Sequence, residues 1–157
     1  MIDAMRRRLL KGSLLAGSAG IAADVGLLSS RQVLASWNQT AFQSQNVPTA
    51  LTSLLGSETT ETSDQIRIKA PDIAADGTVF SVTVETDLDG MTVIAIIASK
   101  NQTPLIAAFA FHGSAIPFVS TRIKMAETAD VVAVVKAGDR LYQNSKRIKV
   151  ASSGCGG

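Results

Sequence analysis

The fold is decided by Val93-Ile94-Ala95-Ile96-Ile97-Ala98 and Leu105-Ile106-Ala107-Ala108-Phe109-Ala110-Phe111, two apolar runs separated by a break at Lys100–Pro104. Short apolar runs bounded by turn residues predict buried β-strands. Neither run alternates with polar residues, so both faces of each strand need cover, whereas a two-layer sandwich buries only one face of each sheet. We expect a constitutive partner subunit on the second face, because an exposed apolar patch commonly marks an interface. The alternative is cover by an N-terminal helix around Leu51–Leu55.

Other segments on both sides of these runs alternate between apolar and polar residues, a pattern typical of strands with one buried face. Turn residues separate these segments at roughly the 8–12-residue spacing of a β-sandwich, and no ten-residue helical pattern lies between them. The sequence therefore predicts an all-β fold, an immunoglobulin-like antiparallel sandwich within residues 65–150. Its strands, about seven in all, are expected at 66–70, 80–85, 93–98, 105–111, 119–125, 131–135 and 141–150, with turns at Pro71-Asp72, Asp76-Gly77, Asp87–Gly90 and Ala137-Gly138-Asp139.

The segment before the sandwich, residues 36–64, predicts a short helix and a linker. Asn46 suits the N-cap of the helix, Pro48 suits its first turn, and Gly56 suits its end. The apolar residues between them share one face of that helix. Glu58–Asp64 is acidic and rich in threonine, which indicates a solvated linker.

Residues 1–35 are interpreted as an export signal. Arg6–Arg8 and Lys11 form a charged head, and the weakly apolar run Gly12–Leu28 follows it. The twin arginine favours the Tat route, which exports folded proteins, so we expect the protein in the periplasm. Val33–Ala35 provides small or modest residues for cleavage, which places the mature start near Ser36. The alternative is a soluble amphipathic N-terminal helix with a basic end.

Removal of this signal changes the charge balance of the chain. The complete sequence has a formal net charge of +2, but residues 36–157 contain ten basic and eleven acidic residues. The apparent basicity therefore belongs to the signal. What remains has no basic excess of the kind that nucleic-acid-binding domains carry, and no polybasic patch for a membrane surface.

The only cysteine of the chain, Cys155, lies in the tail Ser152-Ser153-Gly154-Cys155-Gly156-Gly157. Glycine reaches most of backbone space and chain ends are seldom ordered, so residues 151–157 are interpreted as a flexible arm. Ser153, Gly154, Gly156 and Gly157 would give this arm its flexibility, and Cys155 would be an attachment point for a substrate. The alternatives are a small buried cysteine and an incidental disordered end. A single cysteine cannot form an internal disulfide or a dithiol redox pair.

Sequence motifs of enzymes are missing. The chain contains no P-loop, H-E-x-x-H, C-x-x-C or G-x-S-x-G motif, so phosphate, zinc and hydrolase chemistry have no support. His112 is the only histidine, and a structural or solvated role suits its place at a strand end. We therefore expect no catalytic residue, no metal site and no cofactor.

The tail and the body together resemble the SoxY family, the sulfur-carrier subunits of the periplasmic Sox thiosulfate-oxidation system. The resemblance rests on three features of this sequence: the terminal Gly154-Cys155-Gly156-Gly157, the segment Lys69–Ala74 with Asp76-Gly77 after it, and the segment Ser120–Thr128. It covers essentially the whole predicted mature chain and the Tat signal. Ser153 departs from the family, which commonly has glycine there.

The resemblance implies a covalent carrier without catalytic activity of its own. The family pairs with SoxZ, and the SoxAX cytochrome joins the cysteine, here Cys155, to the sulfane sulfur of thiosulfate. SoxB then releases sulfate by hydrolysis, and the sulfur dehydrogenase SoxCD, where present, oxidises the persulfide that remains. On this interpretation Cys155 visits each enzyme in turn.

Three other classes of function remain as alternatives. The first is an exported immunoglobulin-like structural or interaction module with an incidental thiol. The second is a ubiquitin-like sulfur carrier activated at its Gly-Gly end, although that chemistry needs ATP and the fold needs a longer helix. The third is an enzyme with a catalytic thiol, which would need a positioned base.

Overall fold

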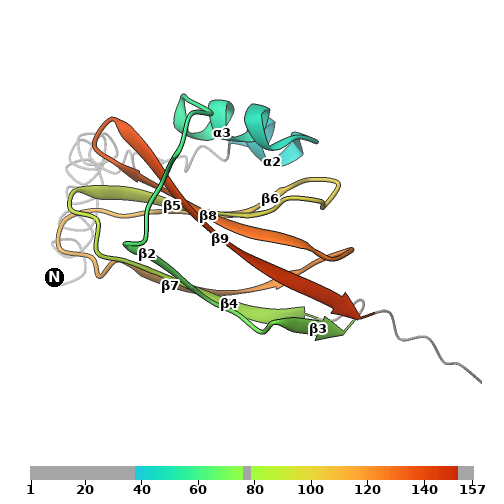
Figure 1. The fold of residues 1–157 in the computed structure, drawn as a ribbon. Coiled ribbons are helices and arrows are strands. Elements are labelled where there is room, and N and C mark those ends of the chain that lie inside the picture. The colour runs from blue at the N-terminus through green and yellow to red at the C-terminus, as the bar shows by residue number, and fades with distance from the viewer. Residues whose placement is uncertain (1–37, 76–78, 152–157) are drawn as a thin grey trace, which may run out of the picture. The chain divides into compact units, whose positions relative to one another are not determined.

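The computed structural model describes residues 38–75 and 79–151 (Figure 1). All of them belong to the second of two compact units, residues 37–157. The expected export signal, its cleavage site and the turn at Asp76-Gly77 lie outside the described residues.

Nine strands of the described chain form two sheets. The large sheet has the order β1-β9-β8-β5-β6, with β3 also paired to β9, and the small sheet has the order β2-β4-β7. Their bounds are β1 Glu61–Thr62, β2 Ile66–Lys69, β3 Ile73–Ala75, β4 Val79–Thr86, β5 Met91–Ala98, β6 Leu105–Ala110, β7 Phe118–Lys124, β8 Ala129–Ala137 and β9 Arg140–Ala151.

The main core lies between the two sheets. Alternate residues of β4, β5 and β8 point into it, and Ile94, Ile96 and Ile148 are fully buried there together with Val82 and Val84 of the small sheet. Burial of a side chain of this size stabilises the fold by about 1.5–3 kcal/mol. The predicted all-β sandwich is therefore confirmed.

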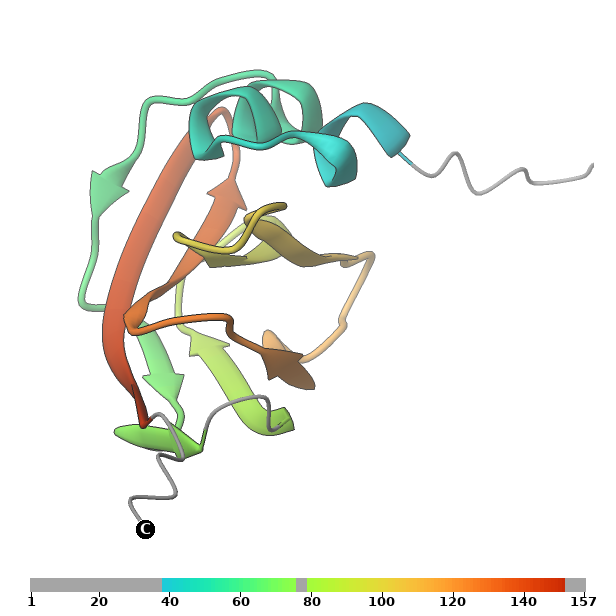
Figure 2. The same ribbon diagram turned by 90° about the vertical axis from the view of Figure 1, so that its right-hand side faces the viewer.

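Two helices cover the second face of the large sheet. Helices α2 (Gln39–Gln43) and α3 (Val47–Leu55) lie on the side of the large sheet away from the small one (Figures 1 and 2). Leu51 and Leu55 pack there against residues of β5, β6, β8 and β9 that point away from the main core. Those sheet residues are Ala95, Ile97, Leu105, Val134 and Leu141.

The expectation of a partner subunit on this face is therefore wrong for β5. Ala95 and Ile97 are fully buried within this chain, because the helices take the place assigned to the partner. The apolar run of β5 belongs to a strand between two layers of the same chain, whereas residues 106–109 of β6 are only half-buried. The run of β5 therefore gives no support for a partner.

The sequence signals of the longer helix are confirmed. The Asn46 side chain accepts a hydrogen bond from the backbone N–H of Thr49 at 2.9 Å, and Gly56 ends the helix with φ +84°. Lys136 of β8 donates to the carbonyl of Leu55 at 3.2 Å, which satisfies one of the unpaired carbonyls at that helix end. The cap and this bond fix α3 over the sheet.

The strand count differs from the expected seven, because two short strands lie in segments predicted as turn or linker. β1 lies within the linker Glu58–Asp64, and β3 follows the turn at Pro71-Asp72. Both pair in parallel with β9. Segments of two or three residues carry no periodicity, so only the edges of β9 determine that they are strands.

Among the described residues, no helix is long and apolar enough to cross a membrane.

Candidate functional site

The predicted attachment residue Cys155 lies outside the described residues, and so do Ser153, Gly154, Gly156 and Gly157. The structure does describe the base from which this tail continues. β9 runs from Arg140 to Ala151, one residue further at each end than the sequence predicted, so the first residue assigned to the arm belongs to the sheet. Cys155 follows only four residues later.

Both edges of β9 are paired at the end that leads to the tail. On one edge β8 pairs Ala129 with Ile148, and on the other β3 pairs Ala75 with Ala151 in parallel register. The backbone N–H of Lys149 also donates to the carbonyl of Asp72 at 2.9 Å. The strand is thus held on both sides up to its last described residues.

Just before β8 begins, the side chain of Thr128 takes the place of a backbone partner for β9. The Thr128 hydroxyl accepts from the backbone N–H of Val150 at 2.9 Å and lies 3.5 Å from the Val150 carbonyl, to which it donates. Thr128 precedes the first residue of β8, so its side chain continues the bonding by one position. No local sequence pattern indicates this contact, because the two residues are 22 positions apart.

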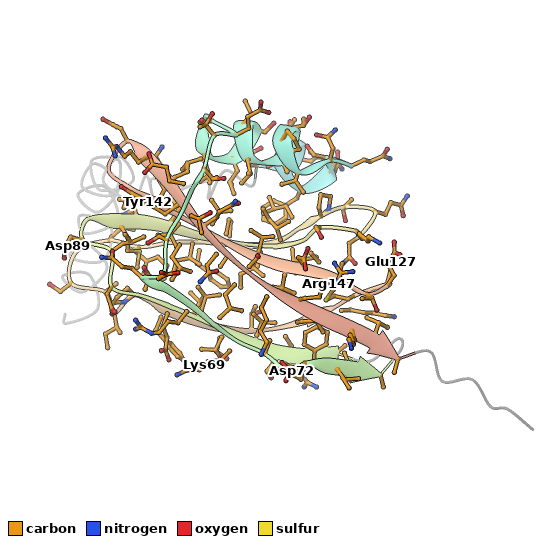
Figure 3. All side chains as sticks on the ribbon, viewed as in Figure 1. Lys69, Asp72, Asp89, Glu127, Tyr142 and Arg147 are labelled. Atoms are coloured by element: carbon orange, nitrogen blue, oxygen red, sulfur yellow. The ribbon has the colours of Figure 1, made fainter. Side chains whose placement is uncertain are left out.

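Ion pairs surround the same end of the sandwich. Lys146 of β9 contacts Asp72 at 3.0 Å and donates to the carbonyl of Ala70 at 2.5 Å, which ties β9 to the segment before β3. Arg147 contacts Asp130 at 3.5 Å. Figure 3 shows Arg147 and Glu127 toward the end where the β9 arrow finishes, with Asp89 and Tyr142 toward the opposite end.

A second set of charges lies on the outer face of the small sheet. Arg67 donates two hydrogen bonds to the carboxylate of Asp87, and Lys69 donates to Glu85 at 2.8 Å. The hydrogen bond from Arg67 lowers the pKa of Asp87, and the one from Lys69 lowers the pKa of Glu85. The bond to Asp87 likewise raises the pKa of Arg67. These groups are exposed, so the pairs contribute little to stability.

A shallow groove of about 420 Å³ lies beside the Arg67–Asp87 pair. Ile116 and Phe118 line it and are 79% and 47% exposed. Phe118 pairs with Glu85, six residues along β4 from Val79, and at about 3.3 Å per residue this is roughly 20 Å. Val79 begins β4 soon after the end of β3, and β3 ends opposite Ala151. The groove therefore lies at the other end of the sandwich, separate from the base of the tail.

Candidate catalytic groups do not gather at either end. His112 is exposed in the segment between β6 and β7 and makes no hydrogen bond to another described residue. Among the described residues, no three His, Cys, Asp or Glu side chains are grouped so that they could hold a metal ion. Any pairing of His112 with Cys155 lies outside what the structure describes.

The fold and the base of the tail define a class of protein: a two-sheet β-sandwich whose last strand is fixed on both edges and leads into a short tail with one cysteine. The family model for the sulfur oxidation protein SoxY matches residues 51–155. The chain belongs to the SoxY family. The last residue of the match is Cys155, so the matched region includes the cysteine of the tail.

One solved structure supports this assignment, and a second shares the fold. The sulfur carrier protein SoxY from Chlorobium limicola f thiosulfatophilum is 38% identical, with a TM-score of 0.63 over 73% of this chain and 100% of that chain. A superoxide reductase (neelaredoxin) from Ignicoccus hospitalis is 20% identical, with a TM-score of 0.52 over 59% of this chain and 95% of that one. At that identity the likeness concerns the fold alone. A search of curated proteins found no match.

Proposed function

We propose that this protein is a covalent carrier of sulfur intermediates in thiosulfate oxidation, with Cys155 as the point of attachment. One observation carries the proposal: the only cysteine of the chain ends the region matched by the SoxY family, four residues beyond a strand held on both edges. The similarity to the Chlorobium sulfur carrier supports the same role.

The chemistry needs only the thiol from this chain. In the loading step the Cys155 sulfur bonds to the sulfane sulfur of thiosulfate, and one proton and two electrons leave, giving Cys–S–S–SO₃⁻. The SoxAX cytochrome accepts the electrons. Water then attacks the terminal sulfur in SoxB, which releases sulfate and two protons and leaves a persulfide on Cys155. Where SoxCD is present, it oxidises this persulfide, and this chain acts as substrate throughout.

The body of the protein would provide a docking scaffold and no reacting group. We propose that it pairs with SoxZ in the periplasm after Tat export, as the family resemblance and residues 1–35 suggest. A carrier also needs a tether between scaffold and thiol, and the glycine-rich sequence after Ala151 suits that purpose. No resident cofactor is required.

Intact-mass analysis of the full protein from cells grown with and without thiosulfate tests the proposal. We expect an adduct of thiosulfonate or persulfide mass on the C-terminal peptide, removed by a reductant and missing from Cys155→Ser. The matched control is Ser153→Gly, which restores the residue common in the family and should carry the same adduct. If Cys155→Ser cells with no second copy of the gene consumed thiosulfate at the normal rate, the protein would instead be a structural or interaction module.

A further inference from the structure

Most charged side chains without an ion-pair partner among the described residues divide by sign between the two ends of the sandwich; the exception is Lys136, which lies at the end away from the tail and donates to the Leu55 carbonyl. Arg122, Lys124 and Lys149 are exposed, and none of them contacts a carboxylate of a described residue. Lys149 lies on β9 two residues before Ala151. Lys124 ends β7, opposite Val79, and lies four residues before the Thr128 that holds Val150. All three cations therefore lie toward the base of the tail.

The opposite end carries unpaired carboxylates. Asp64, Asp89 and Asp139 make no ion pair with a described residue. Asp89 lies in the turn after β4 and Asp139 in the turn after β8, and these turns meet where the N–H of Gly138 donates to the carbonyl of Gly90 at 3.4 Å. Asp64 precedes β2, whose first residue pairs with the last residue of β4.

The charge separation is not a matter of net charge, because the described residues carry ten basic and ten acidic side chains. The other basic residues near the base of the tail are neutralised within the chain: Lys100 contacts Glu127 at 3.6 Å, and Lys146 and Arg147 contact the carboxylates described above. Among the described residues, the charges therefore form a dipole along the strands, positive at the end that leads to the tail.

Chain length restricts where an enzyme acting on Cys155 can bind. Four residues separate Ala151 from Cys155, and a fully extended chain spans at most about 3.6 Å per residue, or roughly 14 Å. An enzyme that receives the thiol must approach the cationic end to about that distance. The groove beside Phe118, at the other end of β4, is too far away for the same contact.

We propose that the cationic end of the sandwich, marked by Arg122, Lys124 and Lys149, is a docking surface for the acidic faces of the enzymes that act on Cys155. Arg122 and Lys124 project from one face of β7, the edge strand of the small sheet, about 7 Å apart at two residues of strand rise. A cationic surface favours a partner with an acidic surface. The dipole would also orient the protein during approach, so that the end that leads to the tail faces that partner. This inference rests on the proposed carrier function and adds the chemistry of the partner surface.

The test uses the double variant Arg122→Glu/Lys124→Glu of the full protein with its SoxZ partner. The second-order rate constant for thiosulfate loading by SoxAX from the same organism is measured across a salt series. We expect a decrease of about tenfold or more at low salt, since steering of this kind changes association rates by roughly 10–10³. The difference should shrink near 1 M salt, where the Debye length is about 3 Å.

Arg140→Glu is the matched control, because Arg140 is an exposed cation at the other end of β9. It should load within about twofold of the unmodified protein, since surface charges more than a Debye length from the contact are largely screened. Loading of the double variant at the normal rate, or with an unchanged salt dependence, would overturn the proposal.

Two further measurements separate the possible causes. Labelling of Cys155 by iodoacetamide, a neutral reagent, should proceed equally in all variants; slower labelling of the double variant would mean that the cations act on the thiol and would overturn the docking proposal. The midpoints of thermal unfolding should also agree among the unmodified protein, the double variant and Arg140→Glu. A large decrease for the double variant would count against the docking proposal, because the loss of loading would then follow from unfolding. Cys155→Ser tests the carrier function by itself, so the two ideas can fail independently.

Discussion

The hydroxyl of Thr128 bonds both backbone polar groups of Val150, accepting from its N–H at 2.9 Å and donating to its carbonyl at 3.5 Å. This contact lies one residue before Ala151, where β9 gives way to the tail that carries Cys155. A tethered thiol samples a volume set by its fixed point. Under the proposed carrier function, Thr128 would therefore help to set the fixed point from which the tail extends.

Replacing Thr128 by valine should loosen the end of β9. Valine has the shape of threonine but no hydroxyl, so the N–H of Val150 loses its acceptor, at a cost of about 1 kcal/mol. We expect faster hydrogen exchange at the Val150 amide, with little change at Ile148, which is fully buried and paired with Ala129. Thr128→Ser keeps the hydroxyl and is the control. Equal exchange in all three proteins would contradict the role assigned to Thr128.

Removal of the helix contact should destabilise the whole sandwich. Leu51 is 4% exposed between α3 and the large sheet, and a buried Leu→Ala change costs about 2–5 kcal/mol. Urea denaturation of Leu51→Ala measures the loss. Thr52→Ala, exposed on the next position of the helix, should change the free energy of unfolding by less than about 0.5 kcal/mol. A cost below about 1 kcal/mol for Leu51→Ala would mean that the helix does not cover the sheet.

Acidification should weaken the contacts between the charged residues of the small sheet. The pKa of Asp87 lies below its ordinary value of 3.8 because Arg67 donates to the carboxylate. A depressed pKa in the folded state contributes stability above the ordinary pKa, and this contribution is lost as the pH falls through the folded value. Arg67→Gln should raise the pKa of Asp87 toward its ordinary value and reduce that loss.

Carboxyl NMR titration of Asp87 measures this shift directly. Arg122→Gln is the control, because Arg122 lies on the same face of the sheet without a carboxylate partner among the described residues. It should leave the pKa of Asp87 unchanged. An Asp87 titration that Arg67→Gln did not alter would show that the pair does not form in solution.

The hairpin that leads into β9 should depend on Gly138. Its φ of +58° lies in the left-handed region, and a side chain there would have no neighbour within 4 Å. Gly138→Ala should therefore cost about 1 kcal/mol through backbone strain without a steric clash. Gly138→Asn should cost less, because asparagine tolerates this conformation. Thermal unfolding compares the two, and an equal loss in both would contradict a purely conformational cause.

Local sequence patterns predicted the strands that alternate clearly and the longer of the two helices. Alternation predicted β2, β4 and β7, and Asn46 and Gly56 predicted the bounds of α3, because these signals act through neighbours in the chain. The terminal motif together with the segments Lys69–Ala74 and Ser120–Thr128 likewise indicated the SoxY family, and the match over residues 51–155 confirms it. Each of these features is local.

The contacts between distant segments became known only from the three-dimensional fold. The apolar run of β5 requires cover on both faces, but its sequence is equally compatible with a partner subunit and with this chain's own helices. The pairing of β3 with β9, the contact of Thr128 with Val150 and the separation of unpaired charges all join residues distant in sequence. Such contacts depend on how the layers pack. They cannot be predicted from periodicity, because segments of two or three residues are too short to show a period.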